Sequence, residues 1–138
     1  MKRPRRRGDA GGQSPAASTP VVAIVDDDAS VRPSMLRLVR SFGYHAEAFG
    51  SGEEFLASPI AAEAACLLLD VRMPGMDGLE VQRRLTEKGA GIPIVFLTSR
   101  ATDDEERQAR RGGAVDFLRK PVGRGTLFEI LQKLTEQK

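Results

Sequence analysis

The sequence of 138 residues is poor in the residues that form cross-links or anchor a chain at a membrane surface. It contains one cysteine, one tyrosine and no tryptophan. The single cysteine, Cys66, excludes an intramolecular disulfide framework and a cysteine-based zinc site. The longest uninterrupted apolar run, residues 64–69, is far shorter than the roughly 20 residues of a membrane-spanning helix. We therefore expect a single domain in a reducing, cytoplasmic setting, with no membrane partner.

The charge of the chain is distributed unevenly. The formal net charge is +2, but residues 1–20 contain five basic side chains and one acidic side chain, a net charge of +4, so residues 21–138 sum to −2. Residues 8–20 are nearly all small residues, glycine or proline, which bury too little apolar surface to offset the entropy of ordering. We predict a disordered basic tail over residues 1–20 and a folded domain over residues 21–138. No apolar segment follows the arginines, so the tail is not a secretory signal, and contact with nucleic acid is expected only through this tail.

Short apolar runs and amphipathic stretches alternate from residue 21 onward. Each apolar run is too short for a helix and is followed by a segment with helical periodicity or helix-capping residues. The expected strands cover 21–25, 44–49, 66–69, 92–97 and 114–118, and the expected helices cover 31–42, 51–57, 79–87, 102–111 and a final stretch around 127–134. Parallel neighbours need crossover connections, so this alternation favours a sheet covered by helices on both faces. The predicted fold class is α/β, a doubly wound five-stranded parallel sheet.

Polar residues that can carry chemistry follow the expected strands directly. The first strand is followed by Asp26, Asp27 and Asp28, the third by Asp70, the fourth by Thr98 and Ser99, and the fifth by Lys120. Ligands of such sheets bind at the carboxyl ends of the strands, beside the point where the strand order reverses. In the order 2-1-3-4-5 the first and third strands are neighbours. The carboxylates that follow these two strands then converge. The fourth and fifth strands supply a hydroxyl group and an ammonium group from one side.

This set of side chains suits phosphoryl transfer to a carboxylate. Clustered carboxylates repel one another unless a cation neutralises them, and Mg2+ prefers oxygen ligands and pairs with phosphate. A carboxylate such as Asp70 beside Mg2+ can attack phosphorus and form an acyl phosphate. Lys120 and Thr98 are then available as donors to the phosphoryl oxygens. No glycine-rich phosphate loop follows the first strand, so no nucleotide site is predicted.

Four segments of the chain resemble the receiver domain of bacterial two-component response regulators. They are IVDDD at 24–28, LLLDVRMPGMDG at 67–78, FLTS at 96–99 and GAVDFLRKP at 113–121. The resemblance covers about residues 20–136 and implies the flavodoxin-like strand order 2-1-3-4-5. It implies a signalling phosphoprotein that catalyses its own phosphorylation and dephosphorylation and has no turnover substrate.

The resemblance implies where the phosphoryl group and the metal ion bind. Asp70 matches the phospho-acceptor, which takes its phosphoryl group from a phosphohistidine of a sensor histidine kinase or a phosphotransfer protein. Mg2+ is expected at Asp26, Asp27, Asp70 and the backbone carbonyl of Arg72. The reaction at Asp70 is therefore expected to depend on Mg2+.

The remaining matched residues are implied to respond to phosphorylation. Thr98 matches the switch hydroxyl, Phe117 the aromatic ring that follows its movement, and Lys120 the lysine that contacts the phosphoryl group. The bond from Lys120 to Pro121 is expected to be cis. The response is expected on the surface of the fourth helix, fifth strand and fifth helix, for an unknown downstream protein or a second copy of the chain. A stand-alone receiver is expected, with a fragment of a longer regulator as the alternative.

Two other classes of protein stay open. A phosphatase of the haloacid dehalogenase kind carries Asp-x-Asp after its first strand, which Asp26 and Asp28 provide, although its last acidic motif should follow the lysine. A non-catalytic receiver-like interaction module would keep the fold without phosphorylation. Single residues also have structural interpretations, with Asp28 as a turn former, Thr98 as a helix N-cap and Phe117 as a core residue.

Two arginines flank the expected acceptor site. Arg72 follows Asp70 by two residues, and Arg100 follows Thr98 by two. Long cationic side chains in these places can restrict the approach of water to an acyl phosphate. We predict that Arg72 and Arg100 alter the rate at which the phosphoryl group is hydrolysed.

The expected fourth helix, residues 102–111, has Ala109 as its only apolar anchor. Asp103 with Arg107 and Glu106 with Arg110 have the i,i+4 spacing of weakly stabilising ion pairs. Because so little burial holds this helix, we predict that it is the most labile element and part of the surface that phosphorylation changes.

Overall fold

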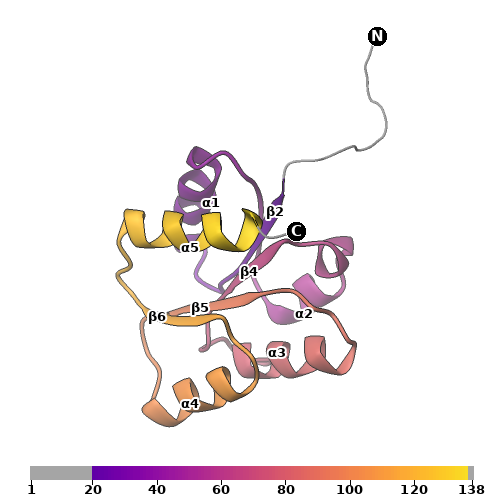
Figure 1. Ribbon diagram of the computed structural model, residues 1–138. Coiled ribbons are helices and arrows are strands. Elements are labelled where there is room, and N and C mark those ends of the chain that lie inside the picture. Colours follow the sequence, from indigo (N-terminus) through magenta and orange to yellow (C-terminus); the bar gives the residue numbers. More distant parts are fainter. Residues whose placement is uncertain (1–19, 137–138) are drawn as a thin grey trace.

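The computed structural model describes residues 20–136 and contains a five-stranded parallel sheet between two layers of helices (Figure 1). The strands are β2 (Val21–Val25), β3 (His45–Phe49), β4 (Cys66–Leu69), β5 (Ile94–Thr98) and β6 (Asp116–Arg119). The helices are α1 (Val31–Ser41), α2 (Gly52–Leu56), the 3-10 helix η1 (Pro59–Ala62), α3 (Gly78–Glu87), α4 (Asp103–Arg111) and α5 (Arg124–Glu136). The sheet order is β3-β2-β4-β5-β6, which in chain order is 2-1-3-4-5. The predicted fold class and strand order are confirmed.

The three central strands β2, β4 and β5 are almost entirely apolar because both faces of the sheet are covered, whereas the edge strands β3 and β6 also contain polar residues. One face packs against α1 and α5, and the other packs against α2, α3 and α4 (Figure 1). Successive residues therefore enter opposite cores: Ile24 lies in the core under α1 and α5, and Val25 in the other. Cys66 is fully buried in the first of these cores, and burial raises the pKa of its thiol to about 12. Cys66 is thus a small residue of the apolar core.

Three strands begin later than the sequence predicts, β3 by one residue and β5 and β6 by two. Ile92 and Pro93 precede β5, and proline has no N–H to donate to a ladder. Before β6, the N–H of Ala114 donates to the carbonyl of Ala109, so Ala114 belongs to the turn that ends α4. The prediction also missed η1, a single short turn with proline at its start.

Side-chain caps fix the first turns of three helices. Ser51 accepts from the N–H of Glu54 at the start of α2, as predicted, and Asp77 accepts from the N–H of Glu80 at the start of α3. Thr102 caps α4 and forms a reciprocal capping box with Glu105. Thr98 is the last residue of β5, so its alternative interpretation as a helix cap is wrong.

The ion pairs of α4 differ in part from the prediction. Glu106 pairs with Arg110 at 3.0 Å, as the spacing indicates. Asp103 instead lies 3.6 Å from Arg119 of β6, and Arg107 pairs with Asp104. The helix is thus tied to the neighbouring strand as well as to itself.

No helix of the described part of the chain is long and apolar enough to cross a bilayer. The predicted tail falls almost wholly on residues 1–19, which lie outside the described residues. Its disorder and its contact with nucleic acid therefore stay predictions.

Candidate functional site

Three carboxyl groups converge at the carboxyl ends of β2 and β4. Asp26 and Asp27 follow β2, Asp70 follows β4, and one oxygen from each lies within 4.8 Å of the others. A backbone bond joins these two strand ends, since the N–H of Asp70 donates to the carbonyl of Val25. A second bond, from the N–H of Asp26 to the carbonyl of Phe49, joins β2 to its other neighbour β3. The site therefore follows from the pairing of neighbouring parallel strands. Asp26 is buried and Asp27 exposed, so the cluster is open on one side.

The surroundings of Asp70 shift the pKa of its carboxyl group. Burial, and then the negative charge of Asp26, raise the pKa of the Asp70 carboxyl above its ordinary value. The positive charge of Lys120 acts in the opposite direction. In this structure the Lys120 ammonium group donates to Asp26 at 2.8 Å, and the Lys120 N–H donates to the carbonyl of Thr98. The lysine thus lies inside the acidic cluster, and its peptide bond to Pro121 is cis as expected.

A close backbone contact holds the segment that follows Asp70. Gly78 is the first residue of α3, and its N–H donates to the carbonyl of Val71 at 2.9 Å. A Cβ atom at Gly78 would lie 2.2 Å from the carbonyl oxygen of Asp70. Glycine is therefore required there, and α3 fixes the backbone position of Asp70.

Thr98 and Phe117 lie behind the carboxyl cluster. Thr98 is fully buried, and its hydroxyl donates to the carbonyl of Arg100 at 2.9 Å. Phe117 is 5% exposed, and its ring centre lies 5.7 Å from that of Phe96. The guanidinium group of Arg119 covers the ring at 5.5 Å. Phe117 is thus a core residue in this structure, and its role as a switch stays a prediction.

Asp28 has a different role from its two neighbours. Its carboxylate accepts from the N–H and the hydroxyl of Ser30, and these bonds lower the pKa of Asp28. It is not one of the three carboxyl groups that converge. The interpretation of Asp28 as a turn former is confirmed, which removes the Asp26 and Asp28 pair that a phosphatase of the haloacid dehalogenase kind would use.

Arginines surround the acidic cluster. The cavity over the carboxyl groups measures about 360 Å3, and Arg72, Arg100 and Lys120 line it together with the aspartates. Arg32, in the first turn of α1, donates to the backbone carbonyl of Asp26 at 2.8 Å. The site thus combines three clustered carboxyl groups with several cationic donors.

Two residues of this neighbourhood were missed by the sequence analysis. One is Arg32, whose signal was a cation in the first turn of the helix that follows the aspartates. The other is Glu105 of α4, which pairs with Arg72 at 2.9 Å. No local pattern indicates that pair, because the two residues are 33 positions apart and belong to different connections of the sheet.

The response regulator receiver domain family matches residues 22–132. The chain belongs to this family. The resemblance stated from the four motifs is therefore confirmed, and the receiver domain takes up most of the sequence.

Two curated relatives show the range of similarity. Nodulation protein W of Bradyrhizobium diazoefficiens is 40% identical over 127 residues, which are 92% of this chain and 56% of that protein. The response regulator protein TodT of Pseudomonas putida is 45% identical over 101 residues, 73% of this chain and 44% of that protein. The receiver chain thus spans about half the length of the curated relatives it matches.

Solved structures agree with the fold. A response regulator receiver protein from Burkholderia phymatum is 39% identical, with a TM-score of 0.73 over 85% of this chain and 95% of that one. The N-terminal fragment FixJ-N is 31% identical, with a TM-score of 0.77 over 88% of this chain and 97% of that one. Both coverages are nearly complete, so the receiver fold accounts for almost the whole described chain.

Proposed function

We propose that this receiver accepts a phosphoryl group on Asp70 from a phosphohistidine of a sensor histidine kinase or phosphotransfer protein, in a reaction that depends on Mg2+. The observation that carries the proposal is the convergence of Asp26, Asp27 and Asp70 within 4.8 Å, with Lys120 inside the cluster. A static carboxyl cluster could serve a structural role. Burial, and then the charge of Asp26, raise the pKa of Asp70, which supports a role in binding a cation in place of a purely structural one.

The residues present fit a magnesium ion. Three carboxylates on an open rim provide the oxygen ligands that Mg2+ prefers, and the backbone carbonyl of Arg72 adds a fourth candidate. When bound, Mg2+ supplies positive charge that neutralises the carboxylates and the oxygens of the incoming phosphoryl group. Asp26, Asp27, Asp70 and the carbonyl of Arg72 are the proposed ligands.

The chain's own residues then supply the nucleophile and the donors. A carboxylate oxygen of Asp70 attacks phosphorus, the new O–P bond forms as the P–N bond of the donor imidazolium breaks, and neutral imidazole leaves. Lys120 exchanges its carboxylate partner Asp26 for a phosphoryl oxygen. Thr98 exchanges the carbonyl of Arg100 for another oxygen of the same group. Phe117 can follow Thr98, because the two residues lie on neighbouring paired strands.

The output is proposed to be a change in the surface formed by α4, β6 and α5. This surface includes Arg119, which binds the loop before α4 and covers the ring of Phe117. A movement of Thr98 and Phe117 would therefore reach the surface through Arg119. The partner is proposed to be a downstream signalling protein or a second copy of the chain.

Incubation with acetyl phosphate and Mg2+, followed by intact mass measurement and peptide mapping, tests the proposal. We expect the mass to increase by one phosphoryl group, with the modification on Asp70 and no modification in the presence of EDTA. The Asp70→Asn variant should stay unmodified. An unmodified wild-type chain would instead favour a non-catalytic interaction module.

A further inference from the structure

We propose that Arg72 is a positioning residue that binds Glu105 of α4 before phosphorylation and the phosphoryl group afterwards, so that phosphorylation releases the first turn of α4. This inference rests on the proposed phosphorylation of Asp70. It adds a direct connection from the loop that follows Asp70, here called the acceptor loop, to α4. This connection does not pass through Thr98 and Phe117.

Arg72 contacts both ends of the proposed connection. Its backbone N–H donates to the carboxylate of Asp70 at 3.3 Å, and it lines the cavity over the carboxyl groups. Its guanidinium group donates to Glu105 at 2.9 Å. The same oxygen of Glu105 accepts from the N–H of Thr102, which closes the capping box of α4. One carboxylate thus holds the start of α4 to its own cap and to the acceptor loop.

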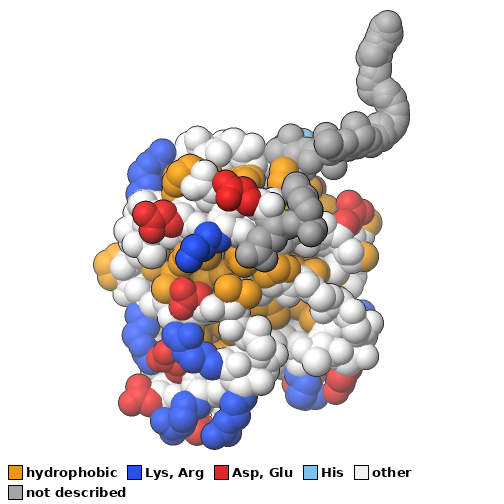
Figure 2. Space-filling model, viewed as in Figure 1, with side chains coloured by type: hydrophobic (Ala, Val, Ile, Leu, Met, Phe, Trp, Pro, Cys, Tyr) orange, Lys and Arg blue, Asp and Glu red, His pale blue; other side chains and the backbone are white. Residues whose placement is uncertain are grey.

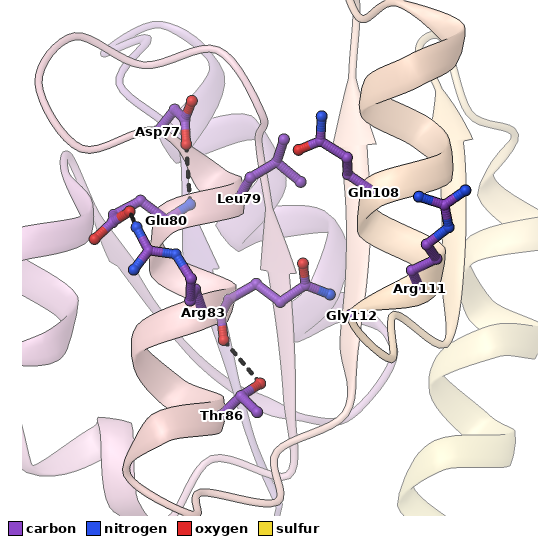
Figure 3. Close-up of a pocket in the computed structure, with 9 residues that line it drawn as sticks. Asp77, Leu79, Glu80, Arg83, Thr86, Gln108, Arg111 and Gly112 are labelled. Carbon is purple, nitrogen blue, oxygen red and sulfur yellow. Dashed lines mark hydrogen bonds and ion pairs between the residues drawn. The ribbon is translucent and has the colours of Figure 1, made fainter.

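The C-terminal end of α4 is held in a different way, by buried contacts. Ala109 is fully buried, and the amide of the buried Gln82 on α3 donates to its carbonyl at 2.9 Å. A Cβ atom at Gly112 would lie 2.7 Å from Gln82, so the two helices are in close contact there. Figure 3 shows this groove, with Thr86 of α3 on one side and Gln108, Arg111 and Gly112 on the other. These contacts do not depend on charge.

Exposed charges hold the N-terminal end. Arg119 donates to the carbonyl of Ala101 and to Glu106, and Arg72 donates to Glu105. Acidic and basic side chains accordingly lie intermixed over the α4 region in Figure 2. A new charge at Asp70 therefore acts on the start of α4 and leaves its buried end in place.

A phosphoryl group is the stronger partner for Arg72. The Arg72 side chain is 49% exposed and that of Glu105 19% exposed, and ion pairs near the surface contribute little because water screens them. A phosphoryl group carries more negative charge than a carboxylate and offers several oxygens to the planar guanidinium group. Arg72 is attached to the loop that follows Asp70, so the transfer requires only a change of its side-chain rotamer. Glu105 then keeps only its bond to the N–H of Thr102.

The Glu105→Gln variant tests the inference. Glutamine keeps an acceptor for the N–H of Thr102, so the capping box survives, but it removes the charge that holds Arg72. We expect the initial rate of phosphorylation by acetyl phosphate with Mg2+ to rise about two- to fivefold, which is the factor that a weak ion pair represents. The matched control is Glu106→Gln, one position along α4, because Glu106 binds Arg110 and Arg119 but makes no contact with Arg72. Its rate should stay within about twofold of the wild-type rate.

Amide hydrogen exchange provides a second readout that a merely structural role of Glu105 would not produce. Beryllofluoride with Mg2+ should accelerate exchange at residues 102–106 of the wild-type chain and leave residues 108–112 unchanged. In Glu105→Gln the exchange at 102–106 should already be fast without beryllofluoride. If the wild-type chain is phosphorylated but Glu105→Gln matches it in both rate and exchange, the inference is wrong and the proposed function stands. If the wild-type chain is not phosphorylated on Asp70, both are wrong.

Discussion

Asp70 is held in a position where its negative charge is unfavourable. Burial and Asp26 raise its pKa, and Lys120 only partly compensates because it is bound to Asp26. A group whose pKa is raised in the folded state binds protons more readily when the chain is folded. Its ionised form therefore lowers the free energy of unfolding at neutral pH, and this loss is recovered as the pH falls through the raised pKa.

We predict that Asp70→Asn raises the melting temperature at pH 7 in EDTA. Relief of about 1 kcal/mol of unfavourable charge burial and repulsion corresponds to roughly 3–5 °C in a domain of this size. The difference should shrink as the pH falls toward the ordinary value of 3.8, because both side chains are then uncharged. Thermal denaturation followed by circular dichroism between pH 4 and pH 8 measures it.

The matched control is Asp104→Asn on α4. The pKa of Asp104 is lowered by hydrogen bonds to Gln108 and Arg107, so its charge stabilises the folded state above its ordinary pKa. Asp104→Asn should therefore not raise the melting temperature at pH 7. Equal stabilisation by both variants would show that the effect of Asp70→Asn does not come from the carboxyl cluster.

Arg100 offers a second prediction at this scale. Its exposed side chain lines the cavity over Asp70, and we predict that it restricts the access of water to a phosphoryl group there. We expect Arg100→Ala to shorten the half-life of the phosphorylated chain about threefold, a change of about 0.7 kcal/mol in the barrier. Loss of the phosphoryl group after removal of acetyl phosphate measures the rate, with Arg107→Ala as a control away from the cavity. An unchanged half-life would mean that Arg100 does not limit hydrolysis.

At the scale of elements, α4 is the helix whose two ends are held by different forces. Its buried end depends on the fit of Gly112 against Gln82, and its exposed end depends on charge. The sequence analysis predicted that the whole helix is labile because Ala109 is its only apolar anchor. The structure adds the buried hydrogen bond from Gln82, which lies on α3 and carries no local signal. Lability is therefore expected at the first turn in particular.

Gly112→Ala tests the buried end. The new methyl group would meet the Gln82 side chain at 2.7 Å and displace it from the carbonyl of Ala109. We predict a loss of about 1–2 kcal/mol in the free energy of unfolding, the effect of a broken buried hydrogen bond. Urea denaturation measures it.

Gly125→Ala is the matched substitution in α5. Nothing lies within 4 Å of a Cβ atom at Gly125, so alanine there adds helix propensity without a clash. We expect a gain of about 0.5–1 kcal/mol. A loss of stability in both variants would indicate a general effect of glycine replacement instead of a contact between α3 and α4.

At the scale of the whole molecule, metal binding should stabilise the fold, because the three proposed carboxylate ligands converge only when β2 and β4 are paired. We predict that the melting temperature rises with Mg2+ concentration, with a gain of about 2.7 kcal/mol at a hundredfold excess over the dissociation constant. Differential scanning fluorimetry with a Mg2+ titration measures it.

The response to Mg2+ should be lost in Asp26→Asn and kept in Glu63→Gln, which alters an exposed acid outside the carboxyl cluster. A response that survives in Asp26→Asn would place the ion elsewhere. A response lost in both variants would indicate a nonspecific effect of net charge.

The sequence by itself determined the α/β class, the approximate positions of five strands and five helices, and the presence of acids at two neighbouring strand ends. It did so because hydrophobic periodicity, caps and strand-end residues are local properties that a linear pattern records. The family motifs then supplied the strand order. Most boundaries differ by at most one residue, and the two-residue shifts before β5 and β6 occur where a proline or the end of a helix changes the local hydrogen bonding.

Only the tertiary structure decided which of the charged residues meet. In the folded chain Asp28 forms a turn with Ser30 and does not join the carboxyl cluster. Lys120 pairs with Asp26, which is 94 positions away, and Arg72 pairs with Glu105, which is 33 positions away. The physical reason is that strand pairing and helix packing set the distances and side-chain directions between distant segments. An ion pair between such segments depends on both. No pattern within one segment contains that information.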